Sequence, residues 1–111
     1  MTADPSSSSD AAPALFLVVT IRPRPDKRAE AEAQLHKMRA ASQAEEGCVF
    51  MTLVDRPEEP DSWTMIEKFA SQAAWDEHMA SAHNQQGNAV LEPLLREPSD
   101  LRVYSEKIPA S

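Results

Sequence analysis

The chain has 111 residues, the length of one domain with a single modest core, and its formal net charge is −7. A chain with this net charge lacks the basic surface of a nucleic-acid-binding protein, and an anionic membrane would repel it, which is why we expect neither partner. The single cysteine, Cys48, excludes an internal disulfide and a cysteine metal cluster. No apolar run reaches the roughly 18 residues of a membrane-spanning helix.

Serine and acidic residues dominate the start of the chain. Because so few apolar side chains cannot offset the entropy of ordering, we predict a disordered tail over residues 1–13 and one folded domain over residues 14–108. The same segment lacks the basic start and apolar core of a secretory signal, so we expect a cytoplasmic protein.

The first half of the domain predicts a strand followed by a helix. Residues 15–21 are mostly apolar and rich in β-branched side chains, which predicts a strand buried on both faces. Asp26 is a suitable cap for a helix over residues 27–44, a stretch without glycine or proline. Gly47 is placed to end that helix.

Two strands joined by a short turn follow. Residues 49–54 and 63–69 are strand-like, and the turn-rich segment 56–61 between them is too short for a crossover helix, so the two strands should pair antiparallel. The alternation in the later strand places Glu67 on the same face as three large apolar residues (Trp63, Met65 and Phe69).

The last third predicts two helical pieces and a final strand. Ser71 should cap a short helix over residues 72–79, a break is expected at 81–85, and a second piece over 88–95 is interrupted by Pro93. Residues 101–105 alternate as a strand. The predicted order is β-α-β-β-α-β, an α+β, ferredoxin-like domain with an antiparallel sheet.

Three residues are candidates for acid–base chemistry. Glu67 on an apolar face needs either a structural hydrogen bond, to a histidine or the backbone, or a role in a pocket. His78 and His83 are either satisfied structural groups or acid–base groups. Their spacing is not the i, i+4 spacing that places two ligands on one helical face, so we predict no metal site. With only two glycines, Gly47 and Gly87, no glycine-rich phosphate loop is available for a nucleotide cofactor.

The few aromatic residues should lie mainly in the core. A flat aromatic ligand would nevertheless use some of them as pocket walls, and Trp63, Phe50 and Trp75 are the candidates for substrate binding.

Several motifs in this order resemble the antibiotic-biosynthesis monooxygenase family, which includes quinol monooxygenases. They are a Glu-x-Gly-Cys segment (45–48), Glu67 ending a strand with Phe69 close behind, and His78 followed by a Ser-x-His segment (81–83). The resemblance covers about residues 15–107. It implies a homodimer in which two ferredoxin-like sheets form a dimeric α+β barrel.

The resemblance also implies a function: a cofactor-independent monooxygenase that oxidises a quinol-like or polyphenolic aromatic molecule with dioxygen, using no metal or flavin. On this hypothesis His78 and His83 supply acid–base or hydrogen-bonding groups, and Glu67 orients one of them. The alternatives are an isomerase of a small carbonyl compound and a non-catalytic, ligand-binding or stress-related dimer. Met51 and Asn84 replace aromatic residues common in relatives, and Asn88, where haem-degrading relatives carry an axial histidine, argues against haem degradation.

Overall fold

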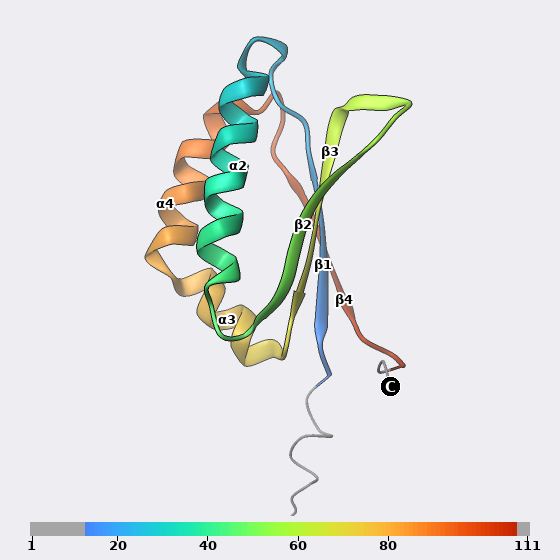
Figure 1. Cartoon of the computed structure of the whole chain (residues 1–111), viewed down its shortest axis with the longest axis vertical. Helices are drawn as coiled ribbons and strands as arrows, with labels where there is room; N and C mark the ends of the chain where they lie inside the picture. The colour runs from blue at the N-terminus through green and yellow to red at the C-terminus, as the bar shows by residue number, and fades with distance from the viewer. Residues whose placement is uncertain (1–12, 109–111) are drawn as a thin grey trace, which may run out of the picture.

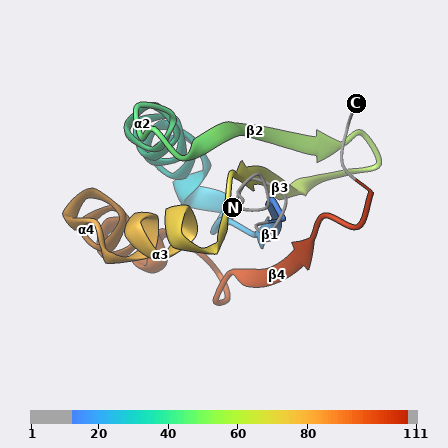
Figure 2. The ribbon, with the colours of Figure 1, turned by 90° about the horizontal axis from the view of Figure 1, so that it is seen from below.

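Four antiparallel strands form one sheet in the order β2-β3-β1-β4, and every helix of the described residues lies on one of its faces (Figures 1 and 2). The computed structural model describes residues 13–108, so most of the predicted tail (1–13) lies outside the described residues. The elements are β1 (Leu15–Ile21), the 3₁₀ turn η1 (Pro25–Lys27), α2 (Arg28–Gln43), β2 (Cys48–Arg56), β3 (Glu59–Phe69), α3 (Gln72–Ala80), α4 (Ala82–Leu91), the 3₁₀ turn η2 (Glu92–Leu94) and β4 (Asp100–Ser105). The predicted ferredoxin-like fold is confirmed.

The predicted alternation of β3 is confirmed. Trp63, Met65, Glu67 and Phe69 are all buried and lie on the face that the helices cover. β3 pairs antiparallel with β2 on one side and with β1 on the other, so these side chains lie in the centre of the sheet. The core therefore sits between the sheet and the α2–α4 layer.

The helix α2 begins later than expected and without the expected cap. Pro25 opens a 3₁₀ turn, and the residue that precedes α2 is Lys27, which makes no side-chain capping bond. The prediction that Asp26 caps this helix was therefore wrong, because the proline, with its fixed φ, turns the chain before the helix starts. The helix is tied to β2 at Met51, whose N–H donates to Gln43 and whose carbonyl accepts from Arg39.

The β2–β3 hairpin is longer than predicted. β3 begins at Glu59 and includes Pro60, although proline cannot donate to a ladder. The structure accommodates Pro60 because the β2–β3 register shifts between Asp55 and Arg56, and because β1 pairs with β3 only from Trp63 onward. Pro60 thus occupies an irregular, unpaired part of the strand.

One residue, Ser81, separates the two helices of the last third. Its side chain accepts from the N–H of Asn84 at 3.2 Å, capping α4, and donates to the carbonyl of His78 at 2.7 Å, closing α3. The predicted break over 81–85 is therefore a single residue, and the second helical piece starts at Ala82. The cap predicted for Ser71 is confirmed, since it accepts from Ala74 N–H. No helix among residues 13–108 is long and apolar enough to cross a membrane.

The sheet face away from the helices carries a half-exposed apolar surface. Phe16 and Val18 on β1 lie there beside Ile66 on β3 and Phe50 on β2, and the rings of Phe16 and Phe50 meet edge-on with centroids 6.2 Å apart. The prediction that β1 is buried on both faces was wrong for the single chain, because the helices cover only the face that carries Leu17 and its neighbours.

Candidate functional site

A cavity of about 270 Å³ lies between the sheet and the helices. Most of its walls are aliphatic or thioether side chains, and its polar groups come from α2, β3, α3, α4, η2 and the segment before β4. The lining residues are Leu17, Val19, Ile21, Leu35, Met38, Ser42, Met51, Met65, Glu67, His78, Met79, Asn84, Asn88, Leu91, Glu92, Ser99 and Leu101. This is a mainly apolar pocket with a few convergent polar groups, the usual form of a small-molecule site.

Glu67 is the most perturbed acid of the cavity. It is 8% exposed and stands between Leu17 of β1 and Met51 of β2 in the sheet register. Burial, followed by the negative charge of Glu45, raises the pKa of Glu67 from 4.5 to about 7. Within residues 13–108 its carboxylate makes no hydrogen bond or ion pair, so near neutral pH it is available to give or accept a proton.

His78 is held between the core and a turn. It lies in the last part of α3, is 5% exposed, and packs its ring on Phe69 with centroids 4.8 Å apart. Its Nδ1 lies 3.1 Å from one carboxylate oxygen of Glu45 and 3.2 Å from the other. The Glu45 contact fixes the ring, and among the described residues Nε2 of His78 makes no hydrogen bond.

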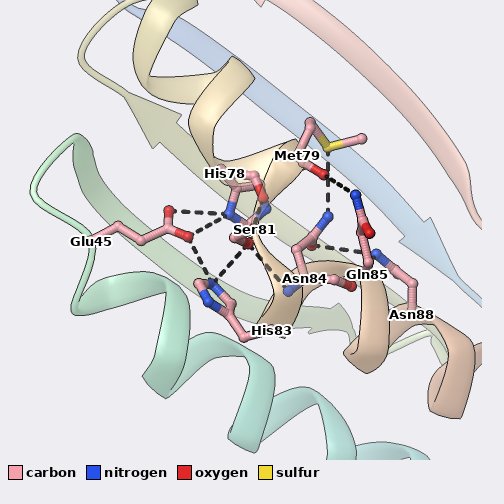
Figure 3. Close-up of polar contacts among 8 residues, drawn as sticks. All are labelled: Glu45, His78, Met79, Ser81, His83, Asn84, Gln85 and Asn88. Carbon is pink, nitrogen blue, oxygen red and sulfur yellow. Dashed lines mark hydrogen bonds and ion pairs between the residues drawn. The ribbon is translucent and has the colours of Figure 1, made fainter.

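His83 joins the same carboxylate from the first turn of α4. Its Nε2 lies 2.7 Å from Glu45 Oε2 and 3.4 Å from the hydroxyl of Ser81 (Figure 3). His83 is 36% exposed and does not line the cavity; it borders a second hollow between α2 and α4. The two histidines therefore share one carboxylate but face different spaces.

The acid that orients the histidines differs from the predicted one. The sequence suggested Glu67, whereas the structure pairs both imidazoles with Glu45, in the turn between α2 and β2. Glu67 and His78 are brought together as walls of one cavity. Neither the predicted Glu67–histidine nor the predicted Glu67–backbone hydrogen bond is present among the described residues. Strand alternation identified Glu67 as buried but could not reveal a partner from a distant turn.

The three aromatic candidates lie outside the cavity, contrary to the expectation that they form its walls. Trp63 is buried at the start of the paired part of β3, where its Nε1 donates to the carbonyl of Pro60 at 3.1 Å. Phe50 lies on the opposite face of the sheet. Trp75 is half-buried on α3, and its Nε1 has no hydrogen-bond partner among the described residues. Aliphatic residues and methionines occupy the wall positions instead.

Three side chains of the site were not predicted as functional. Glu45 was part of the Glu-x-Gly-Cys motif, and the place of that motif in the turn after the first predicted helix was the available signal. Asn84 and Asn88 lie one turn apart on α4, line the cavity, and are linked by a 3.3 Å bond from Asn88 Nδ2 to Asn84 Oδ1. The predicted break over residues 81–85 concealed Asn84, because it hid the first turn of α4, whereas Asn88 began the predicted helical piece over 88–95 and was not singled out as a site residue.

The cysteine and the histidine cluster define what chemistry the region offers. Burial and the charges of Glu45 and Glu67 raise the pKa of Cys48 to about 11, which makes its thiol a poor nucleophile. Glu45, His78 and His83 present three donor atoms within 4.8 Å of one another, a set that could hold a metal ion. The prediction of no metal site rested on the spacing of the two histidines, which argues against a shared face of one helix but not against a site built from two helices, α3 and α4.

Comparison with known proteins identifies the fold and the family model that the sequence fits. Residues 14–90 match the model described as antibiotic biosynthesis monooxygenase. A conserved protein from Methanosarcina mazei Go1 is similar with a TM-score of 0.82 and 22% identity, covering 93% of this chain and 100% of that chain. Rv0793 from Mycobacterium tuberculosis is similar with a TM-score of 0.82 and 28% identity, covering 88% and 99%. SO0527 from Shewanella oneidensis is similar with a TM-score of 0.78 and 26% identity, covering 86% and 92%. No curated protein matches the chain.

Proposed function

Because the chain belongs to the antibiotic biosynthesis monooxygenase family, we propose that it is a cofactor-independent monooxygenase of a small quinol-like or polyphenolic aromatic molecule. The observation that carries the proposal is Glu67, a carboxyl with a pKa of about 7 in an apolar cavity that His78 also lines. A general base is most effective when its pKa lies near the working pH. The volume of about 270 Å³ suits a small ligand.

In this mechanism the protein supplies a base and a dry pocket, and the substrate supplies the electrons. The substrate hydroxyl gives its proton to the Glu67 carboxylate, and the resulting anion donates electrons directly to dioxygen. One oxygen atom bonds to a ring carbon and the other leaves as water, so a quinol becomes a hydroxyquinone and no external reductant is needed. Exclusion of water keeps the anion reactive, and the fixed walls hold it in place.

The second role in the mechanism belongs to His78. Glu45 holds its Nδ1 at 3.1 Å, which favours the tautomer with the proton on Nδ1 and a free Nε2. In that state Nε2 accepts a hydrogen bond from a substrate hydroxyl. His83 then acts as the second imidazole that keeps Glu45 in place, through the 2.7 Å contact.

A second candidate function is an isomerase of a small carbonyl compound. It is favoured by the composition of the cavity wall, which contains no phenylalanine, tyrosine or tryptophan among the described residues. A buried carboxyl poised near neutral pH also suits proton transfer next to a carbonyl group. In that case Glu67 moves a proton between two carbons of the substrate, and dioxygen takes no part.

The proposal includes a homodimer, in which a second copy covers the open face of the sheet. Phe16, Val18, Ile66 and Phe50 supply an apolar surface there that no helix covers within residues 13–108. The ion pair of Lys68 with Glu106 (3.4 Å) borders this surface and would fix the register of the partner. Covering the surface adds to the burial that a domain of this size needs.

Oxygen uptake by chelator-treated protein tests the proposal. Wild-type protein is mixed with quinols, anthrones and flavonoids, and dioxygen consumption and product are followed from pH 5 to 9. We expect uptake whose rate rises as pH passes about 7, because Glu67 must be ionised to accept the proton. Glu67→Gln should lower kcat by about 10²–10⁴-fold, whereas Glu77→Gln, on the exposed side of α3, should not. Product without uptake supports the isomerase, and binding without turnover refutes both enzymes in favour of a binding protein.

A further inference from the structure

We propose that the Glu45–His78–His83 cluster is a binding site for a divalent transition-metal ion such as Zn²⁺. Three segments that are separate in sequence meet there: the α2–β2 turn, the end of α3 and the start of α4 (Figure 3). Two imidazole nitrogens and one carboxylate are among the commonest protein ligand sets of zinc, and water occupies the remaining position when such a set is incomplete. This site goes beyond the proposed oxygenase, which uses no metal.

The donor atoms already have nearly the spacing that a metal ion imposes. With bonds of about 2.0–2.1 Å, the donors of a tetrahedral zinc site lie about 3.3 Å apart. Glu45 Oε1 is 3.1 Å from His78 Nδ1, Glu45 Oε2 is 2.7 Å from His83 Nε2, and all donor atoms of the set fall within 4.8 Å. Rotamer adjustments of a fraction of an ångström to about 1.5 Å would complete the set.

The scaffold around the donors is rigid on two sides and open on the third. His78 is 5% exposed and packed against Phe69, and Ser81 fixes the angle between the helices that carry the histidines. Backbone bonds on both sides of the turn hold Glu45: its N–H donates to Ser42 and its carbonyl accepts from Cys48. His83 is 36% exposed, which leaves a route for the ion and for a water ligand. Such support is what a preorganised site requires.

The competing explanation is that the cluster is only a pair of hydrogen bonds to one carboxylate. Two neutral imidazoles, each donating an N–H to Glu45, would have the same distances. The two explanations differ in chemistry, because a metal needs the lone pair of each ligating nitrogen and therefore competes with protonation of the imidazoles, so its binding tightens as pH rises. Zinc has no redox chemistry of its own, so here it would tie the α2–β2 turn to the α3–α4 junction rather than activate dioxygen.

Metal titration of chelator-stripped full-length protein tests the inference. Calorimetry with Zn²⁺ should give one ion per chain, with a rise in melting temperature, and Co²⁺ should give the visible absorption of a four-coordinate site. Glu45→Gln and His83→Ala should each weaken binding at least about tenfold, the lower end of what losing even an outer-shell partner costs. His36→Ala is the matched control, since His36 is exposed on α2 and its one ion pair within residues 13–108 is with Glu32, at 3.7 Å.

Each outcome decides the question. The site is supported if Zn²⁺ binds 1:1 and saturably, and if both cluster variants weaken this binding while the control variant does not. The cobalt spectrum of wild-type protein supports the site independently of how the variants fold. Absence of saturable binding, equal affinity in the cluster variants, or loss of binding in His36→Ala overturns it. The metal titration involves no substrate. If Zn²⁺ does not bind, the oxygen-uptake test of the stripped protein is unaffected, and if no oxygen is consumed, the proposed metal site is unaffected.

Discussion

Replacing Glu67 with glutamine should make the protein more stable than wild type above pH 7 while leaving its stability near pH 4 almost unchanged. Glutamine keeps the size of the side chain but cannot ionise. In the wild type, burial raises the pKa of Glu67 from 4.5 to about 7. The folded state therefore favours the protonated carboxyl. The stability that the protonated Glu67 contributes is complete below about pH 4.5 and is lost as pH rises through about 7.

The expected size of the effect follows from that shift. Each pKa unit corresponds to about 1.4 kcal/mol of difference between the protonation states, so the ionised carboxylate costs the wild type about 3 kcal/mol at pH 8. The free energy of unfolding of Glu67→Gln minus that of wild type should thus grow from near zero at pH 4 to about 3 kcal/mol at pH 8. Most of the growth should fall between pH 4.5 and 7.

Urea unfolding at fixed protein concentration measures this difference. Comparing variant with wild type at each pH removes the titrations that the two proteins share. Glu77→Gln, which removes an exposed carboxylate of α3, controls for the loss of one negative charge in a chain of net charge −7. A Glu67→Gln difference that stays flat from pH 4 to 8, or one that falls with pH, would refute the assignment of Glu67 as a desolvated acid.

Three further predictions concern packing, capping and assembly. Gly47→Ala should lower the free energy of unfolding in urea by about 1–3 kcal/mol, because the added Cβ would overlap the Cβ of Ala74 on α3 and would lie 3.3 Å from the Cα of Ala74. An unchanged unfolding midpoint would contradict this contact. Ser81→Ala should lower the free energy of unfolding by about 1–2 kcal/mol, and by more than Ser71→Ala does, since the Ser81 side chain closes α3 and caps α4 whereas Ser71 caps α3 only. Equal losses in the two variants would count against the double role of Ser81. Ile66→Asp should convert a dimer of about twice 12.3 kDa into a monomer by sedimentation, because it places a charge on the open sheet face; wild-type protein that already sediments as a monomer would reject the dimer.

Local sequence signals determined most of the fold. The apolar run of β1, the alternation of β3 and the Ser71 cap each act within a few residues, so their positions could be predicted closely. The errors occurred where tertiary context altered a local rule. Pro25 turned the chain before α2 could use the cap of Asp26, and the register shift opposite Asp55 and Arg56, where the extra residues belong to β3, let β3 extend through Pro60.

The candidate site was only partly predictable, for a related reason. Periodicity can state which face of a strand or helix a residue occupies, and this placed Glu67 among buried apolar residues. It carries no information about which distant turn meets that element. The pairing of Glu45 with His78 spans 33 positions and depends on how α3 packs beside the α2–β2 turn, so the sequence could not assign it.

Glu45 and Glu67 carry the same carboxylate group, and their surroundings suit them to different roles. Glu45 has two imidazole partners, so it suits orienting His78 or holding a cation. Glu67 has apolar neighbours in the sheet and the charge of Glu45 nearby, and both raise its pKa. A bound cation at Glu45 would reduce that second contribution and shift the Glu67 titration toward lower pH. The pH profile of Glu67 would then report metal occupancy at the neighbouring cluster, and an unchanged midpoint at saturating Zn²⁺ would show that the two sites act independently.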